Sequence, residues 1–314
     1  MAVTIHDLAR MTGLNASTVS RALRNDRRVK PATRERIQEL ARRKGYVPNL
    51  PARQLAAGKT GNIWFCFGSP DADIERETAV ELDNRFDRAG YDLQIVLHSN
   101  QPERFRRRLE KLSQQAADAA VIIPPGDTSA CERYDAILKA LPVPHLFVDR
   151  YWENGVTPVV TTDNALAART LVDRCARWGA RRFYLDFPEH NPVSRTRTRA
   201  AQTRIEELGL PWRNAAELAP SLPAEQPIAI LGNSGKAIGA DRVPREAEIY
   251  GGFFDYWENP TLEFYRSVVI CRQNFAEIAR LAAEITLSML RNPGFEPPLF
   301  TRVEPAEFIE LCDR

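Results

Sequence analysis

Two patterns of apolar and polar residues divide the chain near residue 60. Before that point, apolar residues recur at helical spacing; beyond it, short apolar runs alternate with longer amphipathic segments. The first pattern predicts a small bundle of helices. The second predicts an α/β body in which strands alternate with helices.

Three short helices are predicted in the first 48 residues. Their apolar faces are formed by three sets of residues at helical spacing: Ile5, Leu8 and Ala9; Val19, Ala22 and Leu23; and Ile37, Leu40 and Ala41. Gly13 interrupts the pattern after the first set, Pro31 suits the first turn of the third helix, and Gly45 ends that helix. Thr4, with Asp7 three residues later, predicts a capping box for the first helix.

The second helix has a polar face that its apolar residues leave exposed. Asn15 or Ser17 is expected to cap the start of this helix. The outward positions are Ala16, Ser17, Ser20, Arg21 and Arg24. Small residues allow close approach to DNA, Arg21 can donate two hydrogen bonds to a guanine, and hydroxyls such as that of Thr18 can bind phosphates. We therefore predict a helix that reads the major groove; the alternative is a plain helical bundle with a solvated basic face.

The charge distribution supports a DNA-binding head. The 314 residues include 43 Lys and Arg against 41 Asp and Glu, a net charge of +2. Residues 1–59 hold 13 basic and 4 acidic residues, a net charge of +9, and the remainder holds 30 and 37, a net charge of −7. A basic head on a mildly acidic body indicates one module for a polyanion and a separate module for another ligand.

The head closely resembles the DNA-binding head of the lactose and galactose repressor (LacI/GalR) family. The resemblance rests on residues 3–9 (VTIHDLA), 13–23 (GLNASTVSRAL) and 46–49 (YVPN). It implies a transcriptional regulator, expected to be a repressor, whose helix-turn-helix head binds a pseudo-palindromic double-stranded DNA operator as a homodimer. The residues that we predict to contact DNA are Thr4, Ala16, Ser17, Thr18, Ser20, Arg21, Arg24, Asn49, Ala52 and Leu55.

A short helix is predicted within residues 49–58, opened by Pro51 and closed by Gly58. Alone it is too short to be stable in water. In the resembled family this hinge helix folds on DNA and inserts a leucine into the minor groove; Leu55 has that place here, and Ala52 allows close approach. An apolar wedge suits this role, because it can separate a base step and kink the duplex. The alternative is a plain interdomain linker.

The sequence pattern of the body predicts nine strands and six helices. The strands are expected at 63–67, 91–98, 119–123, 145–149, 157–162, 182–187, 228–231, 247–251 and 268–271, and the helices at 74–89, 102–116, 129–141, 165–178, 194–208 and 275–291. This order indicates two doubly wound lobes with parallel sheets, and the resemblance implies a two-lobed body like that of periplasmic binding proteins. The predicted domains are the head at 1–48, a hinge at 49–59, an N-terminal lobe at 60–158 plus about 272–299, and a C-terminal lobe at 159–271 plus about 300–314.

A small-molecule effector is expected in the cleft between the lobes, because ligands of open α/β sheets bind outside the carboxyl ends of strands. The predicted effector residues are Ser69, Asp71, Asp149, Arg150, Arg197, Asn233 and Asp255. The resemblance singles out Arg197 as the holder of an effector carboxylate, hydroxyl or phosphate. Asp149 and Arg150 together suit a carbohydrate, either a polyol or a phosphorylated sugar. Asp163 is expected to cap the helix that follows it rather than to bind the effector.

Two departures from the family pattern fall at this cleft. Asn233 is followed by Ser234 where relatives usually have Asn-Asp, and Phe254 replaces the first aspartate of a Gly-Phe-Asp-Asp stretch. The usual free-sugar chemistry therefore cannot be carried over. Two alternatives stay open: the cleft binds an altered ligand, or the chain is an effector-independent DNA-binding protein with a degenerate cleft.

Other classes of protein find little support in the sequence. No apolar stretch is long enough to cross a membrane and no export signal is evident, so a cytoplasmic, nucleoid-associated location is expected. Five cysteines without a CxxC motif predict reduced thiols. Four histidines occur, without an HExxH motif, and no GxSxG motif is present. We therefore predict no enzymatic activity, no catalytic residue, no metal site and no cofactor.

Overall fold

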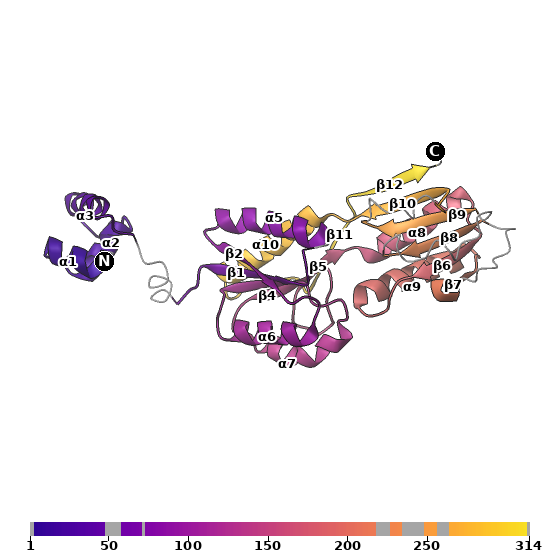
Figure 1. Ribbon diagram of the computed structural model, residues 1–314, viewed down its shortest axis with the longest axis horizontal. Helices are drawn as coiled ribbons and strands as arrows, with labels where there is room; N and C mark the ends of the chain where they lie inside the picture. The colour runs from indigo at the N-terminus through magenta and orange to yellow at the C-terminus, as the bar shows by residue number, and fades with distance from the viewer. Residues whose placement is uncertain are drawn as a thin grey trace. The chain divides into compact units, whose positions relative to one another are not determined.

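The computed structural model describes residues 3–47, 58–70, 73–217, 227–233, 248–255 and 264–312. The chain divides into two units, a head formed by Met1–Thr60 and a body formed by Gly61–Arg314 (Figure 1). Each unit has its own apolar core, as the change of pattern near residue 60 predicts.

The head contains three helices, α1 (Ile5–Thr12), α2 (Ala16–Leu23) and α3 (Pro31–Arg43). The predicted capping box begins α1: the Thr4 hydroxyl accepts a hydrogen bond from the Asp7 N–H at 3.3 Å, and the Asp7 carboxylate accepts one from the Thr4 N–H at 2.9 Å. Gly13 ends α1 with a left-handed φ of 69°. Asn15 occupies the N-cap of α2 but makes no capping hydrogen bond with its side chain, so the prediction of a side-chain cap by Asn15 or Ser17 is wrong.

The head core is formed by side chains from all three helices and from the segment between α2 and α3. Its buried members are Leu8, Val19, Ala22, Val29, Ile37 and Ala41. Val29 lies outside the predicted helices and therefore outside the helical pattern. Because these few side chains fix the orientation of α2, they also fix which of its residues face solvent.

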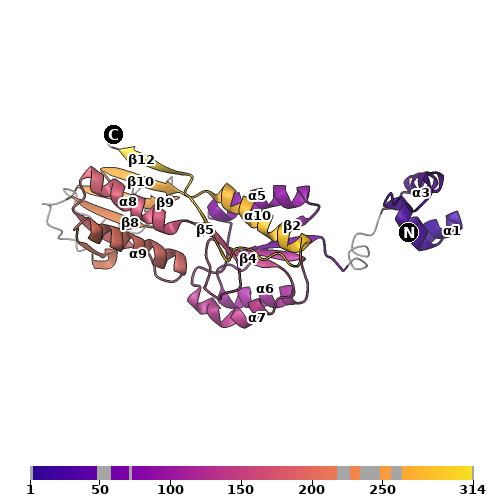
Figure 2. The ribbon, with the colours of Figure 1, turned by 180° about the vertical axis from the view of Figure 1, so that it is seen from behind.

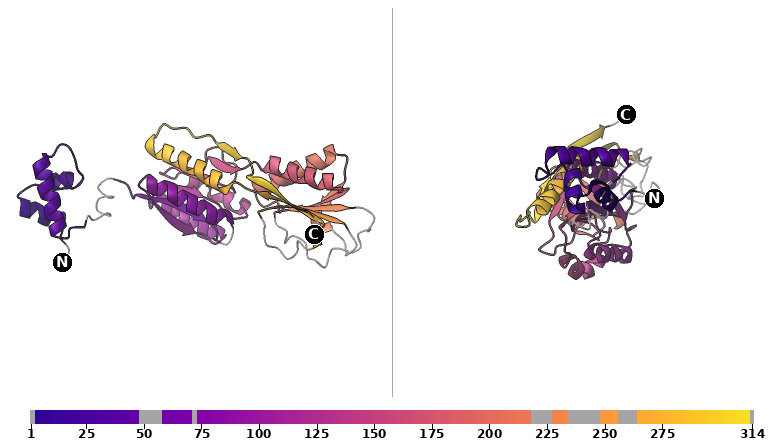
Figure 3. Two further views of the ribbon diagram at one scale, coloured as in Figure 1. Left: turned by 90° about the horizontal axis from the view of Figure 1, so that it is seen from above. Right: turned by 90° about the vertical axis from the view of Figure 1, so that its left-hand side faces the viewer.

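The first sheet of the body has the strand order β11-β5-β4-β3-β1-β2, and all its pairs are parallel. The strands are β1 (Asn62–Phe67), β2 (Asp92–Leu97), β3 (Ala119–Ile122), β4 (His145–Val148), β5 (Val159–Thr162) and β11 (Phe300–Val303). Helices α5 (Asp73–Arg88) and α10 (Phe275–Arg291) lie side by side on one face (Figures 2 and 3). The other face is covered by α6 (Pro102–Ser113), the 3₁₀ helix η1 (Ser129–Tyr134) and α7 (Asp135–Lys139).

The second sheet has the order β12-β10-β9-β8-β6-β7, and only the β10–β12 pair is antiparallel. The strands are β6 (Arg182–Asp186), β7 (Trp212–Asn214), β8 (Ile228–Gly232), β9 (Ile249–Phe254), β10 (Ser267–Arg272) and β12 (Glu307–Cys312). Helices α8 (Asn164–Trp178) and α9 (Pro192–Glu207) pack together on one face, and η2 (Ala215–Glu217) follows β7. The body is therefore two α/β lobes, as predicted.

The lobe boundaries differ from those predicted. The segments that form β5 and β11 were expected in the C-terminal lobe, but the two strands pair with each other in the first sheet, with Phe300 opposite Val159 and Val303 opposite Thr162. The chain crosses to the second sheet after β5 and returns through α10 and β11, and only β12 then adds to the second sheet. An apolar strand pattern does not specify which of two sheets the strand joins, and this is the origin of the error.

Three local predictions also need correction. β7, β11 and β12 were not predicted as strands, and β9 begins at Ile249 rather than at 247 and continues to Phe254. The predicted helix at 129–141 is a 3₁₀ helix followed by a short α-helix. In the described part of the chain, no helix is long and apolar enough to cross a membrane. Cys66, Cys131, Cys175 and Cys271 are buried free thiols and Cys312 is an exposed one.

Candidate functional site

The exposed face of α2 carries the residues that the sequence assigned to DNA. Ser17, Arg21 and Arg24 are exposed, whereas Ala16, Thr18 and Ser20 are half-buried. Val19 and Ala22 are fully buried and hold this orientation. Within the described residues, no carboxylate forms an ion pair with Arg21, so its guanidinium can form two hydrogen bonds to a base edge or a phosphate.

Several basic and polar residues of the head already have partners, among them Thr4 and Arg28. The Thr4 hydroxyl donates a hydrogen bond to Asp7 Oδ2 at 2.7 Å. Together with Arg10, Thr4 lowers the pKa of Asp7 to about 2. Arg28 binds Asp26 at 2.7 Å and holds the pKa of that carboxyl well below its usual range. Arg28 is therefore a weaker phosphate candidate than its neighbour Arg27, which is exposed.

Four predicted site residues lie outside the described residues. They are Asn49, Ala52 and Leu55 of the hinge and Asp71 of the body. Their roles stay predictions.

In the body, Arg197 lies at the centre of a polar cluster at the carboxyl ends of the second-lobe strands. It is 5% exposed. Its Nε donates to Asn164 Oδ1 at 2.7 Å, Nη1 to Asn233 Oδ1 at 2.7 Å, and Nη2 to Gln273 Oε1 at 3.2 Å. The guanidinium carbon also lies 3.5 Å from the centre of the Phe254 ring. Each guanidinium nitrogen therefore has a partner within the protein.

Asp255 joins the same cluster through Gln273. Its Oδ1 accepts the Gln273 N–H at 2.7 Å, and its Oδ2 accepts from Gln273 Nε2. Thr162 completes the cluster, because its hydroxyl donates to Gln273 Oε1 at 2.6 Å. Burial raises the pKa of Asp255 to about 6, against the hydrogen bonds from Gln273 and the charge of Arg197. Asp255, which directly follows β9, has a left-handed φ of 49°.

The first lobe contributes Asp149, Arg150 and Glu75. Arg150 Nη2 lies 3.3 Å from Glu75 Oε1, and Glu75 is 3% exposed. Burial raises the pKa of Asp149 against the attraction of Arg150 and Arg197, and it likewise raises the pKa of Glu75. Arg150 Nε and Glu75 Oε2 are buried without a hydrogen-bond partner. The half-buried Ser69 lies beyond the end of β1 on the same lobe. Unlike the Arg197 cluster, this half leaves buried polar atoms unsatisfied, which is typical of functional sites.

The structure thus brings Arg197, Asn233 and Asp255 into one cluster, with Asp149 as an electrostatic neighbour. Sequence reasoning did not assign Asn164, Gln273 or Glu75 to the site. Asp163 does cap α8, accepting the Leu166 N–H at 3.0 Å, while the adjacent Asn164 reaches Arg197. The Thr162-Asp163-Asn164 sequence at the end of a strand was the available signal.

The two lobes also contact each other directly beside this site. The Thr128 N–H donates to the His190 carbonyl at 3.1 Å, and Asn191 Nδ2 donates to the Gly126 carbonyl at 3.1 Å. Val193 of α9 packs into the apolar core of the first lobe. A change in the relation between the lobes must therefore break or rearrange these contacts.

Comparisons with known proteins agree with this architecture. The family model described as "Bacterial regulatory proteins, lacI family" matches residues 4–49. The maltose regulon regulatory protein MalI of Escherichia coli (strain K12) is 29% identical over 180 residues, covering 57% of this chain and 52% of the relative. Catabolite control protein A of Priestia megaterium is 28% identical over 221 residues, covering 68% of this chain and 64% of the relative. The matches thus span between half and two thirds of these relatives' lengths.

One solved structure shows the fold along nearly the whole chain. It is the Lac repressor dimer bound to operator and the anti-inducer ONPF, with a TM-score of 0.75, 17% identity and 98% coverage of both chains. At that identity the likeness supports the fold, a helical head with a two-lobed body.

Proposed function

We propose that this chain, which belongs to the LacI family of bacterial regulatory proteins, represses transcription by binding an operator sequence as a homodimer. One observation supports this above all: α2 presents Arg21 without an ionic partner among the described residues, beside exposed and half-buried hydroxyls. A helix of this kind can enter the major groove, and two heads can read the two halves of a pseudo-palindrome.

The proposed contacts divide into base readers and positioning residues. Arg21 reads a guanine from the centre of α2, and the small Ala16 permits the approach. Ser17, Thr18 and Ser20 bind phosphates and fix the register of the helix, and Arg24 adds attraction to the backbone. Asn49, Ala52 and Leu55 act in the minor groove, where Leu55 opens a base step.

An effector is proposed at the carboxyl ends of the strands in both lobes. Its proposed ligands are Ser69, Asp71, Asp149, Arg150, Arg197, Asn233 and Asp255. The unsatisfied atoms of Arg150 and Glu75 support a polar ligand on the first-lobe side. A sugar or sugar phosphate has the hydroxyl groups that such atoms bind. Its binding would change operator affinity by favouring one arrangement of the lobes over another.

A second candidate function is effector-independent DNA binding. The Arg197 cluster favours it, because each guanidinium nitrogen already has a partner and Phe254 covers one face of the group. A thermal-shift screen against sugars and sugar phosphates separates the two, since a ligand selective for the folded protein raises its melting temperature. A hit lost in Asp149→Asn supports the effector; a broad screen without any hit supports the second candidate.

DNA binding itself is tested with an operator selected from random duplexes by the purified chain. Fluorescence anisotropy then compares the wild type with Arg21→Ala and Leu55→Ala. Both variants are expected to bind at least about tenfold more weakly. Arg177→Ala, an exposed change on α8, serves as the matched control and should bind like the wild type. Unchanged affinity in both Arg21→Ala and Leu55→Ala would reject the proposed DNA mechanism.

A further inference from the structure

A groove on the outer surface of the body lies where the two lobes meet. Its volume is about 580 Å³, and Arg195 and Arg199 of α9 line it together with Glu132 of η1 and Glu153, which follows β4. The volume falls in the usual range for small-molecule sites, about 300–1,000 Å³. Arg197 is buried and does not line this groove, and neither does any other proposed effector ligand within the described residues, so the groove is separate from the effector site proposed above.

Four charged side chains face this groove without a charged partner. Within the described residues, none of Arg195, Arg199, Glu132 and Glu153 forms an ion pair, and Arg195 donates only to the Glu189 carbonyl at 3.3 Å. Other arginines nearby are paired: Arg169, which also lines the groove, binds Glu207 at 2.8 and 3.1 Å, and Arg204 binds Asp173 at 2.6 Å. The groove therefore has a basic wall from the second lobe and an acidic wall from the first, and each wall has unused hydrogen-bonding capacity.

Contacts beside the groove join the two lobes that form its walls. Val193 at the start of α9 is buried in the first-lobe core. The Thr128–His190 hydrogen bond joins the same two lobes. Further closure of the groove would require these contacts between the lobes to rearrange.

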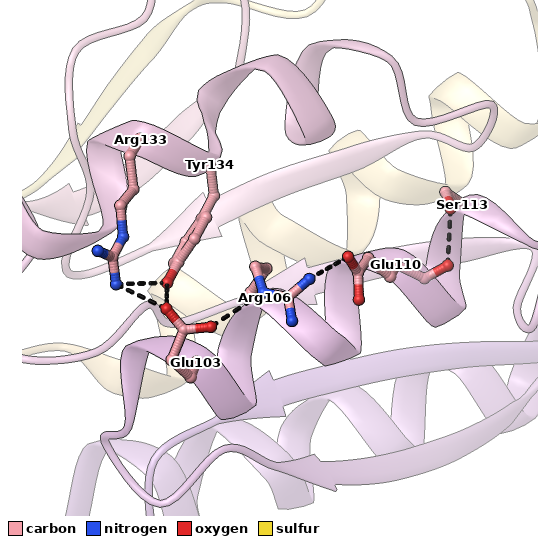
Figure 4. A network of polar contacts seen from close by, with 6 residues as sticks. All are labelled: Glu103, Arg106, Glu110, Ser113, Arg133 and Tyr134. Carbon is pink, nitrogen blue, oxygen red and sulfur yellow. Dashed lines mark hydrogen bonds and ion pairs between the residues drawn. The ribbon is translucent and has the colours of Figure 1, made fainter.

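Hydrogen bonds to α6 hold the segment of η1 that forms part of the acidic wall. Glu103 of α6 accepts hydrogen bonds from Arg133 at 2.8 Å and from the Tyr134 hydroxyl at 2.7 Å (Figure 4). Its other oxygen accepts from Arg106 Nε at 3.0 Å. Because Arg133 and Tyr134 directly follow Glu132 in η1, these contacts fix the segment that presents the Glu132 carboxylate.

We propose that this groove is a second ligand site, for a small bipolar molecule with a phosphate or carboxylate at one end and an ammonium group at the other. The anion binds Arg195 and Arg199, whose guanidinium groups match its geometry, and the Thr203 hydroxyl lines the same wall. The ammonium group binds Glu132 and Glu153. A molecule bound in this way contacts both lobes from outside the cleft.

Isothermal titration of the full chain with glucosamine 6-phosphate tests the site. Glucose 6-phosphate lacks the ammonium group, glucosamine lacks the phosphate, and inorganic phosphate is the anion alone. The wild type is expected to bind glucosamine 6-phosphate with a Kd below about 1 mM and the other three probes more weakly. The double variant Arg195→Gln/Arg199→Gln should bind it at least about tenfold more weakly. In Glu132→Gln/Glu153→Gln the preference for glucosamine 6-phosphate over glucose 6-phosphate should disappear.

Two controls make the outcome decisive. Arg177→Gln, a change of an exposed arginine elsewhere on the second lobe, should leave binding unchanged. Asp149→Asn reports any share of the binding that belongs to the effector site. Binding that is lost in Asp149→Asn but kept in Arg195→Gln/Arg199→Gln would place the probe in the effector site and overturn the proposal. The absence of binding by the wild type would overturn it as well. Neither result bears on operator binding, which is measured separately.

Discussion

The guanidinium carbon of Arg197 lies 3.5 Å from the centre of the Phe254 ring. In the family that the chain resembles, an aspartate is usual at the position of Phe254. An aromatic face replaces a carboxylate as the neighbour of this buried cation, and the remaining partners are the neutral amides of Asn164, Asn233 and Gln273. Desolvation lowers the pKa of Arg197, against the attraction of Asp149 and Asp255.

The Arg197–Phe254 pair should be measurable as a coupling free energy. Arg197→Met leaves three amide acceptors without their donor and is expected to lower the free energy of unfolding by about 2–4 kcal/mol. Phe254→Leu keeps an apolar side chain but removes the ring, and should cost about 1–2 kcal/mol. Urea unfolding of both single variants and the double variant should give a coupling above about 0.5 kcal/mol. Additive effects would show that the ring contributes packing alone.

The raised pKa of Asp255 predicts that the free energy of unfolding depends on pH. Its pKa is about 6 in the folded protein against 3.8 for the free side chain, because burial disfavours the charged form. Between about pH 4 and pH 6 the folded chain therefore binds more protons than the unfolded chain, so this group's contribution to stability falls as pH rises. The wild type should lose about 2–3 kcal/mol relative to Asp255→Asn between pH 4 and pH 7. Urea unfolding at several pH values measures this difference, and a difference that does not change with pH would contradict the raised pKa.

Two arginines of the head should differ in how they affect DNA binding. Arg27 is exposed beside α2 and is expected to bind phosphate, so Arg27→Ala should weaken binding to all duplexes alike. It should also reduce the slope of log affinity against log salt by about 1. Arg28→Ala removes an arginine that Asp26 already holds and should have a smaller effect. Anisotropy titrations at several salt concentrations check both changes. Equal slopes for Arg27→Ala and the wild type would exclude a phosphate contact by Arg27.

The sequence was most informative where one element has a long and regular pattern. Helix α10 spans Phe275–Arg291, as predicted, because its apolar positions recur through five turns and Asn274 caps its start. β7 escaped prediction because its three residues, Trp212 to Asn214, are too few to show alternation. Val29 was missed for a similar reason, since a buried residue between two helices belongs to neither helical pattern.

The site was harder to predict than the fold, because its contacts join distant segments. Parallel-sheet topology placed Asn233 and Asp255 at strand ends, and the family resemblance selected Arg197. The partner Gln273, however, lies 76 positions from Arg197 and directly follows β10, so only the tertiary arrangement of the second lobe brings the two together. Glu75 and Arg150 are likewise far apart in the sequence, at 75 positions. Their pairing depends on the order of strands in the first sheet.

Base-substitution scanning shows whether Arg21 reads an operator base from α2. Each base pair of the selected operator is changed in turn, and affinity is measured by anisotropy for the wild type and for Arg21→Ala. The wild type should lose about 1–3 kcal/mol of binding free energy at one guanine position in each half-site. Arg21→Ala should lose its discrimination at that position and keep it elsewhere. If Arg21→Ala still discriminates at every position as the wild type does, Arg21 is not the base reader and the account is wrong.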